Sequence, residues 1–306
     1  MRTYEVIDAH VHTYKTPEIG RQALSGFHIS GCCGTPEELT GILEEAGVTL
    51  AVQCNMTPAR SMLVAALSGM PEEPSPAEKE ALTRKISDRI RRRNRWTCET
   101  AGTHARLVPF ISLDPIMGRD AMTDEMVQCI EQHGARGLKI HPGEGHFMPD
   151  DTSLHPVYEI LERRGLPVIS HGGLDLANPD PSFTRPEAFA PLLARFPRLT
   201  LVIAHLGRDF FEESVRLAKE FPNVFFDTSA VIPGNETGDP LEGLSSFTDR
   251  EAVAFIRKIG VDRVLFGSDY PWFHPGWDLR RFLRLPFTEE EKAALLGANA
   301  RRILGL

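Results

Sequence analysis

Two histidines, His10 and His12, stand one residue apart at the end of the first apolar stretch of the chain, residues 4–7. In a β-strand alternate side chains point to the same face, so both imidazoles would project the same way from one rigid strand. Two imidazoles held in this manner can bind one divalent metal ion. The pair alone is equally compatible with two satisfied or exposed histidines, and further ligands at the ends of later strands would decide between the two interpretations.

Three later apolar stretches also end in a residue that can ligate a metal ion or transfer a proton. Their endings are Ser170-His171-Gly172, Ala204-His205-Leu206-Gly207 and Gly267-Ser268-Asp269-Tyr270. If these stretches are strands of one barrel, they open on the same carboxyl-terminal face, where the catalytic groups of barrel enzymes converge. Five such residues at four strand ends seldom arise from packing alone. The pattern therefore predicts one metal-dependent site.

Strand and helix patterns alternate along the chain and would position these residues. Thr35-Pro36 marks the start of a helix and Gly47 its end. The eight expected strands cover residues 4–11, 48–53, 106–112, 135–141, 166–170, 199–204, 224–227 and 263–266. Regular alternation implies parallel pairing through right-handed crossovers, and eight such units favour a closed barrel over an open sheet. We predict an α/β protein in which residues 1–306 form one (β/α)8 TIM-barrel domain.

Two segments exceed what a barrel needs, one after strand one and one after strand two. Residues 14–34 are rich in Gly, Ser and Cys and are expected to form a loop over the barrel mouth. Residues 56–104 contain a predicted helix from residue 77 to about residue 100. Its basic run, residues 89–95, could bind an anionic partner, but a solvated helix face or a subunit contact is favoured in a chain this acidic. A homodimer could form through this insertion.

Composition narrows the class of protein. The 306 residues suit one barrel of about 250 residues with insertions, and the formal net charge of -8 argues against a broad nucleic-acid surface. No apolar run approaches the roughly 18 residues of a membrane span, and the start of the chain lacks a signal-peptide pattern. Five cysteines without a CxxC pair favour a reduced compartment. We expect a cytoplasmic protein that binds a small molecule, without nucleic-acid or membrane partners.

The motifs resemble those of the amidohydrolase superfamily, and more closely its amidohydrolase-related branch (amidohydrolase family 2). The resemblance rests on Val6-Ile7-Asp8-Ala9-His10-Val11-His12, Gly137-Leu138-Lys139-Ile140-His141-Pro142, Ser170-His171-Gly172, Ala204-His205-Leu206-Gly207 and Phe266-Gly267-Ser268-Asp269-Tyr270-Pro271, and spans essentially the whole chain. This branch comprises metal-dependent hydrolases and non-oxidative decarboxylases of aromatic or unsaturated carboxylic acids. The resemblance implies metal ligands at His10, His12, His171 and Asp269. It makes His205 a proton-transfer or water-orienting residue, or a ligand of a second metal.

The donor types suggest the chemistry. Imidazoles and a carboxylate suit Zn²⁺, with Mn²⁺ or Fe²⁺ as alternatives. A bound metal lowers the pKa of water from about 15.7 to about 7, and Asp269 could accept that proton and later donate it, while His205 stabilises an oxyanion. We expect a hydrolase acting on an amide, ester or lactone. A metal-dependent decarboxylase is the alternative, and a non-catalytic metal-binding barrel is the third hypothesis.

Other residues near the strand ends keep two interpretations each. Lys139 and His141 share parity on strand four, so both should face inward. The resemblance would allow a carboxylated Lys139 bridging two metals, but an unmodified lysine that binds an anionic substrate or pairs with an acidic neighbour is favoured. His141 could bind substrate or be structural. Arg208 could clamp a carboxylate or lie in surface packing, and Trp272 could line the pocket or stiffen its loop. Asp227 could support a histidine from behind.

Overall fold

Eight parallel strands form the centre of the molecule, and each strand pairs with the next one along the chain. The computed structural model describes residues 4–27, 29–70, 74–175 and 177–306. The strands are β1 (Ile7–Val11), β2 (Leu50–Gln53), β3 (Leu107–Ser112), β4 (Gly137–Ile140), β5 (Val168–Ser170), β6 (Leu201–Ile203), β7 (Val224–Asp227) and β8 (Val264–Leu265). The predicted (β/α)8 barrel is confirmed, although most strands are shorter than the sequence pattern indicates.

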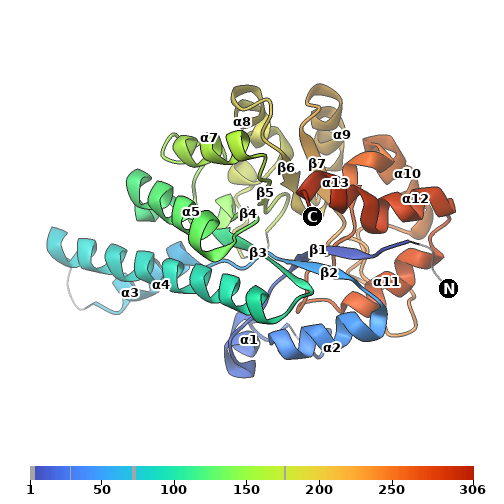
Figure 1. The fold of residues 1–306 in the computed structure, drawn as a ribbon, viewed down its shortest axis with the longest axis horizontal. Coiled ribbons are helices and arrows are strands. Elements are labelled where there is room, and N and C mark those ends of the chain that lie inside the picture. The colour runs from blue at the N-terminus through green and yellow to red at the C-terminus, as the bar shows by residue number, and fades with distance from the viewer. Residues whose placement is uncertain (1–3, 28, 71–73, 176) are drawn as a thin grey trace.

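Helices follow the strands and surround them (Figure 1). They are α1 (Pro17–Ala23), α2 (Pro36–Ala46), α3 (Ala59–Ser68), α4 (Pro76–Thr103), α5 (Arg119–His133), α6 (Pro142–Gly145), α7 (His155–Arg164), α8 (Ala190–Arg195), α9 (Phe211–Glu220), α10 (Asp249–Ile259), α11 (Pro275–Arg284), α12 (Glu289–Ala293) and α13 (Asn299–Leu304). Short 3₁₀ turns include η1 (Pro115–Met117), η2 (Pro181–Phe183) and η4 (Ala204–Gly207). Among the described residues, no helix is both long and apolar enough to cross a membrane.

The barrel closes between the segment after β8 and β1. The backbone N–H of Ala9 donates to Phe266 O at 2.8 Å, that of Asp269 to His10 O at 2.9 Å, and that of His12 to Tyr270 O at 2.7 Å. These bonds alternate between the two segments, as in a parallel ladder. The closure therefore fixes Asp269 directly beside the two histidines of β1.

Apolar side chains form two separate cores, one inside the barrel and one between the strands and the helices. The inner cluster contains Ile7, Ala9, Val52, Cys54, Val108, Phe110, Ile169, Val202, Leu265 and three residues of α13 and its preceding turn, Ala300, Ile303 and Leu304. Large apolar residues thus fill the barrel on the side of the carboxyl-terminal helix. The polar strand ends occupy the opposite mouth, where active sites lie in this fold.

The two insertions differ in part from expectation. Within residues 14–34, predicted to be a loop, α1 forms, with Thr16 accepting a hydrogen bond from Ile19 N and Pro17 at the first helical position. This start signal has the same Thr-Pro form as the one at Thr35, and we missed it. The predicted helix of the second insertion is confirmed as α4, and α3 precedes it unpredicted. The two helices lie side by side and extend away from the barrel (Figure 1).

The basic run of α4 is not simply a solvated face. Ile90 and Asn94 are buried, and Asn94 exchanges two hydrogen bonds with the backbone of Ser112, at 2.9 and 3.0 Å. The guanidinium of Arg93 donates to Thr13 O, 2.5 Å away, and lies within 5.1 Å of the ring centroids of Tyr14 and Trp96. Because Thr13 follows His12, this arginine attaches the insertion to the end of the first metal-donor strand.

Candidate metal centre

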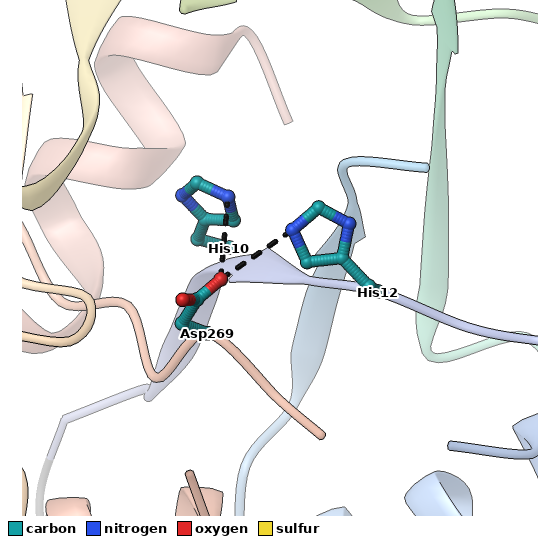
Figure 2. A group of neighbouring side chains, drawn as sticks. All are labelled: His10, His12 and Asp269. Atoms are coloured by element: carbon teal, nitrogen blue, oxygen red, sulfur yellow. Dashed lines mark ion pairs between the residues drawn. The ribbon is translucent and has the colours of Figure 1, made fainter. Parts of the chain in front are cut away.

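Three donor atoms converge at the mouth of the barrel, on His10, His12 and Asp269 (Figure 2). Asp269 Oδ1 lies 3.4 Å from His12 Nε2 and 3.7 Å from His10 Nε2. Ligands about 2.1 Å from a common ion at tetrahedral angles stand about 3.4 Å apart. The spacing therefore fits one cation shared by the three side chains.

The orientation of His10 depends on an irregularity in β1. Asp8 pairs with Ala51, but Val11 pairs with Gln53, so three steps in β1 face two steps in β2. Ile7 and Ala9 belong to the inner core, and strict alternation would turn His10 to the opposite face. An extra residue of this kind re-aims a side chain. The bulge thereby separates His10 from the alternation of Ile7 and Ala9 and allows it to face the site together with His12.

Backbone conformation aims the later donors as well. Asp269 has φ +68° and His205 has φ +60°, both in the left-handed region. Non-glycine residues are uncommon there, and Asp and His are among those that tolerate it best. The chain therefore adopts a sparsely populated conformation at two of the predicted site residues.

Asp227 and Ser229, at the end of β7, orient His10 from behind. Asp227 Oδ2 lies 2.9 Å from His10 Nδ1, and since a carboxylate accepts, Nδ1 carries the proton. His10 Nε2 is then left with its lone pair toward the site. The prediction that Asp227 supports a histidine is confirmed. Ser229, which donates from Oγ to Asp227 Oδ1, was not predicted, because a serine after a strand carries no distinctive signal.

The same pair of residues fixes His205 and, through it, His171. His205 Nδ1 lies 3.0 Å from the carbonyl oxygen of Ser229, which can only accept, so this nitrogen carries the proton. His205 Nε2 is then the acceptor facing His171 Nδ1 at 3.2 Å. It follows that His171 Nε2 holds a lone pair. This atom is buried and has no hydrogen-bond partner among the described residues, as expected of a nitrogen that awaits a metal ion.

Lys139 is buried beside the donors. Its Nζ lies 3.0 Å from His10 Nε2, and no carboxylate lies within ion-pair distance of it among the described side chains. The prediction that Lys139 and His141 both face the barrel mouth is confirmed, since both line one recess there. Lys139 thus presents positive charge next to the atom that would ligate the metal.

His141, His171 and Asp175 form a second group of possible donors. The rings of His141 and His171 stack with centroids 4.0 Å apart, and His141 Nε2 lies 3.7 Å from Asp175 Oδ2. His141 Nδ1 also accepts a hydrogen bond from Glu144 N at 3.1 Å and thereby caps α6, so His141 has a structural role. Asp175 was not predicted, because it lies in the segment after β5 and not at a strand end.

Burial controls the protonation of the histidines and the carboxylate. Burial and the neighbouring His10 lower the pKa of His12 to about 4, and burial lowers the pKa of His205 and of His171 below the ordinary value. Burial alone would raise the pKa of Asp269, but the hydrogen bond with His12 and the charges of His205 and His10 hold it well below its usual range. Neutral imidazoles beside an ionised carboxylate are the state that binds a divalent cation.

Two further predicted residues have different positions. The Trp272 ring lies edge-on to His12 with centroids 5.3 Å apart, so Trp272 borders the site. Arg208 pairs through its backbone with Gly173 and Leu174, and no contact joins its side chain to the three donors among the described residues. The structure therefore supports Trp272, more than Arg208, as a pocket residue.

This chain is similar to proteins of a known family. The amidohydrolase family model matches residues 7–306. A curated 2-amino-3-carboxymuconate-6-semialdehyde decarboxylase of Dictyostelium discoideum is 28% identical over 221 residues, which are 63% of this chain and 59% of that protein, less than two thirds of its length.

Solved structures share the fold at low identity. A 5-carboxyvanillate decarboxylase from Sphingomonas paucimobilis superposes with a TM-score of 0.68 at 16% identity, covering 99% of this chain and 100% of that one. A dihydroxybenzoic acid decarboxylase from Polaromonas sp. JS666, with bound manganese and the inhibitor 2-nitroresorcinol, gives a TM-score of 0.69 at 14% identity, covering 99% and 98%.

These relatives correct one expectation and confirm another. Our expectation of a hydrolase is wrong, because the curated relative and these structural neighbours are decarboxylases. The ligand motifs could not separate the two reactions, since one set of donors serves both. The resemblance on which the site prediction rested is confirmed over nearly the whole sequence. The chain belongs to the amidohydrolase family.

Proposed function

We propose that this protein is a metal-dependent, non-oxidative decarboxylase of a small carboxylic acid. The observation that carries the proposal is the buried Lys139, whose charge has no acidic partner among the described residues and faces the three metal donors. An uncompensated cation in a buried site favours an anionic ligand. A substrate carboxylate answers this need, and the relatives named above act on such acids.

The metal would be held by His10, His12, Asp269 and, through its unpartnered Nε2, His171. The bound cation supplies positive charge that helps Lys139 hold the substrate carboxylate. The donor set does not choose among divalent ions. Manganese is bound in the Polaromonas relative, which makes Mn²⁺ the first ion to test, with Zn²⁺ and Fe²⁺ beside it.

The remaining chemistry belongs to the side chains. The bond between the substrate carbon and its carboxyl carbon breaks, the electron pair stays on the substrate carbon, and a proton replaces the departing carbon dioxide. His205 could deliver that proton from Nε2 once the contact of this atom with His171 Nδ1 is broken, while the carbonyl oxygen of Ser229 keeps Nδ1 protonated. Asp269 would stay ionised and hold the metal, with Oδ1 facing the histidines. Trp272 and the buried histidines exclude water from the reacting carbon.

The test is carbon dioxide release from the purified protein loaded with Mn²⁺, Zn²⁺ or Fe²⁺. The substrates would be hydroxybenzoic, aminobenzoic and muconic acids, and metal content would be measured on the same samples. We expect release from at least one acid, dependent on metal and lost after chelation. Stoichiometric metal without release from any of these acids would contradict the proposal and point to a non-catalytic metal-binding barrel.

A further inference from the structure

A narrow recess lies beside the metal donors, between the ends of β3 and β4 and the insertion after β2. Lys139 and His141 form the side nearest the donors, Asp114 and Glu144 line it as well, and Ile90 of α4 contributes an apolar wall. Its free volume is about 10 Å³. A space of this size holds one water-sized group. It is therefore too small for a ring but large enough for one polar substituent.

Asp114 lines this recess, and one of its two carboxylate oxygens accepts a hydrogen bond. Its Oδ1 accepts a hydrogen bond from Ile116 N at 2.9 Å and caps η1. Oδ2 has no hydrogen-bond partner among the described residues. Burial and the charge of Glu144 raise the pKa of Asp114 to about 6, so at neutral pH the group is mostly an ionised acceptor. An acceptor with no partner, next to an active site, invites a donor from the ligand.

Glu144, the other acid of the recess, is already occupied. Its two oxygens accept from Ser61 N and Ser61 Oγ, each at 2.9 Å, and its own N–H donates to His141 Nδ1. Glu144 therefore joins α3 to α6 and is not free to bind a ligand. Asp114 Oδ2 is left to accept from whatever enters.

The charges around the recess determine the orientation of any acid that binds here. A carboxylate is attracted to Lys139 and to a metal ion held by the donors, and it is repelled by Asp114 and Glu144. A carboxylic acid would therefore bind with its carboxylate at Lys139. Only a neutral hydrogen-bond donor could then occupy the recess without an electrostatic cost.

We propose that Asp114 selects acids that carry an amino or hydroxyl group able to reach this recess, where the substituent donates a hydrogen bond to Oδ2. The inference rests on the proposed function and narrows it to donor-substituted acids. It also gives the insertion after β2 a role in specificity, because Ile90 of α4 and residues 56–57, which follow β2, line the recess. Asp114 would thus decide which acid binds, while the metal donors decide what happens to it.

The experiment measures dissociation constants by calorimetry on the Mn²⁺-loaded protein. The probes are benzoate, its 2-, 3- and 4-amino derivatives, and the N,N-dimethyl form of each amine. The wild type should bind at least one aminobenzoate about tenfold or more tighter than benzoate, since a hydrogen bond to a charged group has that strength. The gain should disappear on dimethylation, which removes the donor and overfills the recess.

Asp114→Asn separates recognition from structure. Asparagine keeps an Oδ1 that can cap η1, but it turns an N–H₂ toward the recess, and an aromatic amine is a poor acceptor. The tenfold gain should vanish while benzoate binds as before. Asp180→Asn is the matched control, because Asp180 caps η2 in the same way, through Ser182 N at 2.9 Å, and does not line the recess.

Two results would overturn the inference. One is a wild type in which no aminobenzoate binds more tightly than benzoate, and the other is an Asp114→Asn variant that weakens benzoate as much as the amines. Carbon dioxide release is measured separately on the same acids. Selective binding without carbon dioxide release would contradict the decarboxylase proposal but support the role of Asp114. Failure of the proposed function can therefore be told apart from failure of this inference.

Discussion

The mouth of the barrel has two unlike sides. On the side of β1, β6, β7 and β8, neighbours fix three site residues: His10 by Asp227, His205 by Ser229, and Asp269 by the closing backbone bonds. On the side of β3, β4 and β5, His171 Nε2 is buried without a hydrogen-bond partner among the described residues, and the partly exposed Asp114 uses only Oδ1 for a hydrogen bond there. The first side is organised for a metal ion, and the second leaves its bonds open for a substrate.

The difference has an energetic meaning. A buried polar atom without a partner costs about 1–3 kcal/mol. Native structures tolerate few such atoms, and mostly where a ligand supplies the missing partner. Ligand binding should therefore stabilise the open side of the site more than the organised side, because it supplies the missing hydrogen-bond partners. The following predictions set one side against the other.

The largest effect is expected from Asp269→Asn on the organised side. The change removes the negative charge of a proposed metal ligand, so decarboxylation should fall by about 10²- to 10⁴-fold. Asparagine tolerates the left-handed backbone, so the fold should persist. Carbon dioxide release and thermal unfolding on one preparation check this, and retained turnover would refute the assigned role.

Asp227→Asn should come next. Loss of the carboxylate behind His10 weakens control of its tautomer, and metal affinity should fall by about 10- to 100-fold. Competition with a chelator measures this. Asp180→Asn, which changes a capping aspartate after β5 outside the donor groups, is the matched control and should leave metal affinity unchanged. Equal losses in both variants would show that the two sides do not differ as described.

Lys139→Met tests the open side directly. Without the ammonium, KM for the acid should rise by about 10- to 100-fold, because a hydrogen bond to a charged group is lost. Metal content should stay the same. If the bound metal instead fell from two ions to one, Lys139 would be the carboxylated bridge that the family resemblance allows, and its role in substrate binding would be wrong.

The smallest effect concerns stability and pH. The folded pKa of Asp114, about 6, exceeds its ordinary 3.8, so the folded state favours the protonated form. Its stabilising contribution is complete below pH 3.8 and is lost as pH rises through about 6, at most about 3 kcal/mol. Asp114→Asn should flatten this part of the stability curve. An unchanged slope between pH 4 and pH 6.5, measured by thermal unfolding, would contradict the shift.

The sequence predicted the organised side better than the open one. Histidine and aspartate at the ends of apolar strands are visible as a pattern, and the barrel topology brings strand ends together. The bulge in β1, which turns His10 inward, depends on pairing with β2 and leaves no mark in the residues themselves. Ser229, Asp175 and Asp114 lie in connections whose course depends on tertiary packing. The choice between hydrolysis and decarboxylation lay beyond the motifs, because it depends on the substrate and not on the ligands.

The left-handed backbone at Asp269 and His205 has a consequence for protein engineering. Strained positions of this kind cost of order 1 kcal/mol or more each, and glycine would adopt them freely. A search for more stable variants would therefore favour glycine at two positions to which the proposed function assigns metal binding and proton transfer. Selection on stability alone would erase the activity of this protein, and a stabilising programme must hold both residues constant from the start.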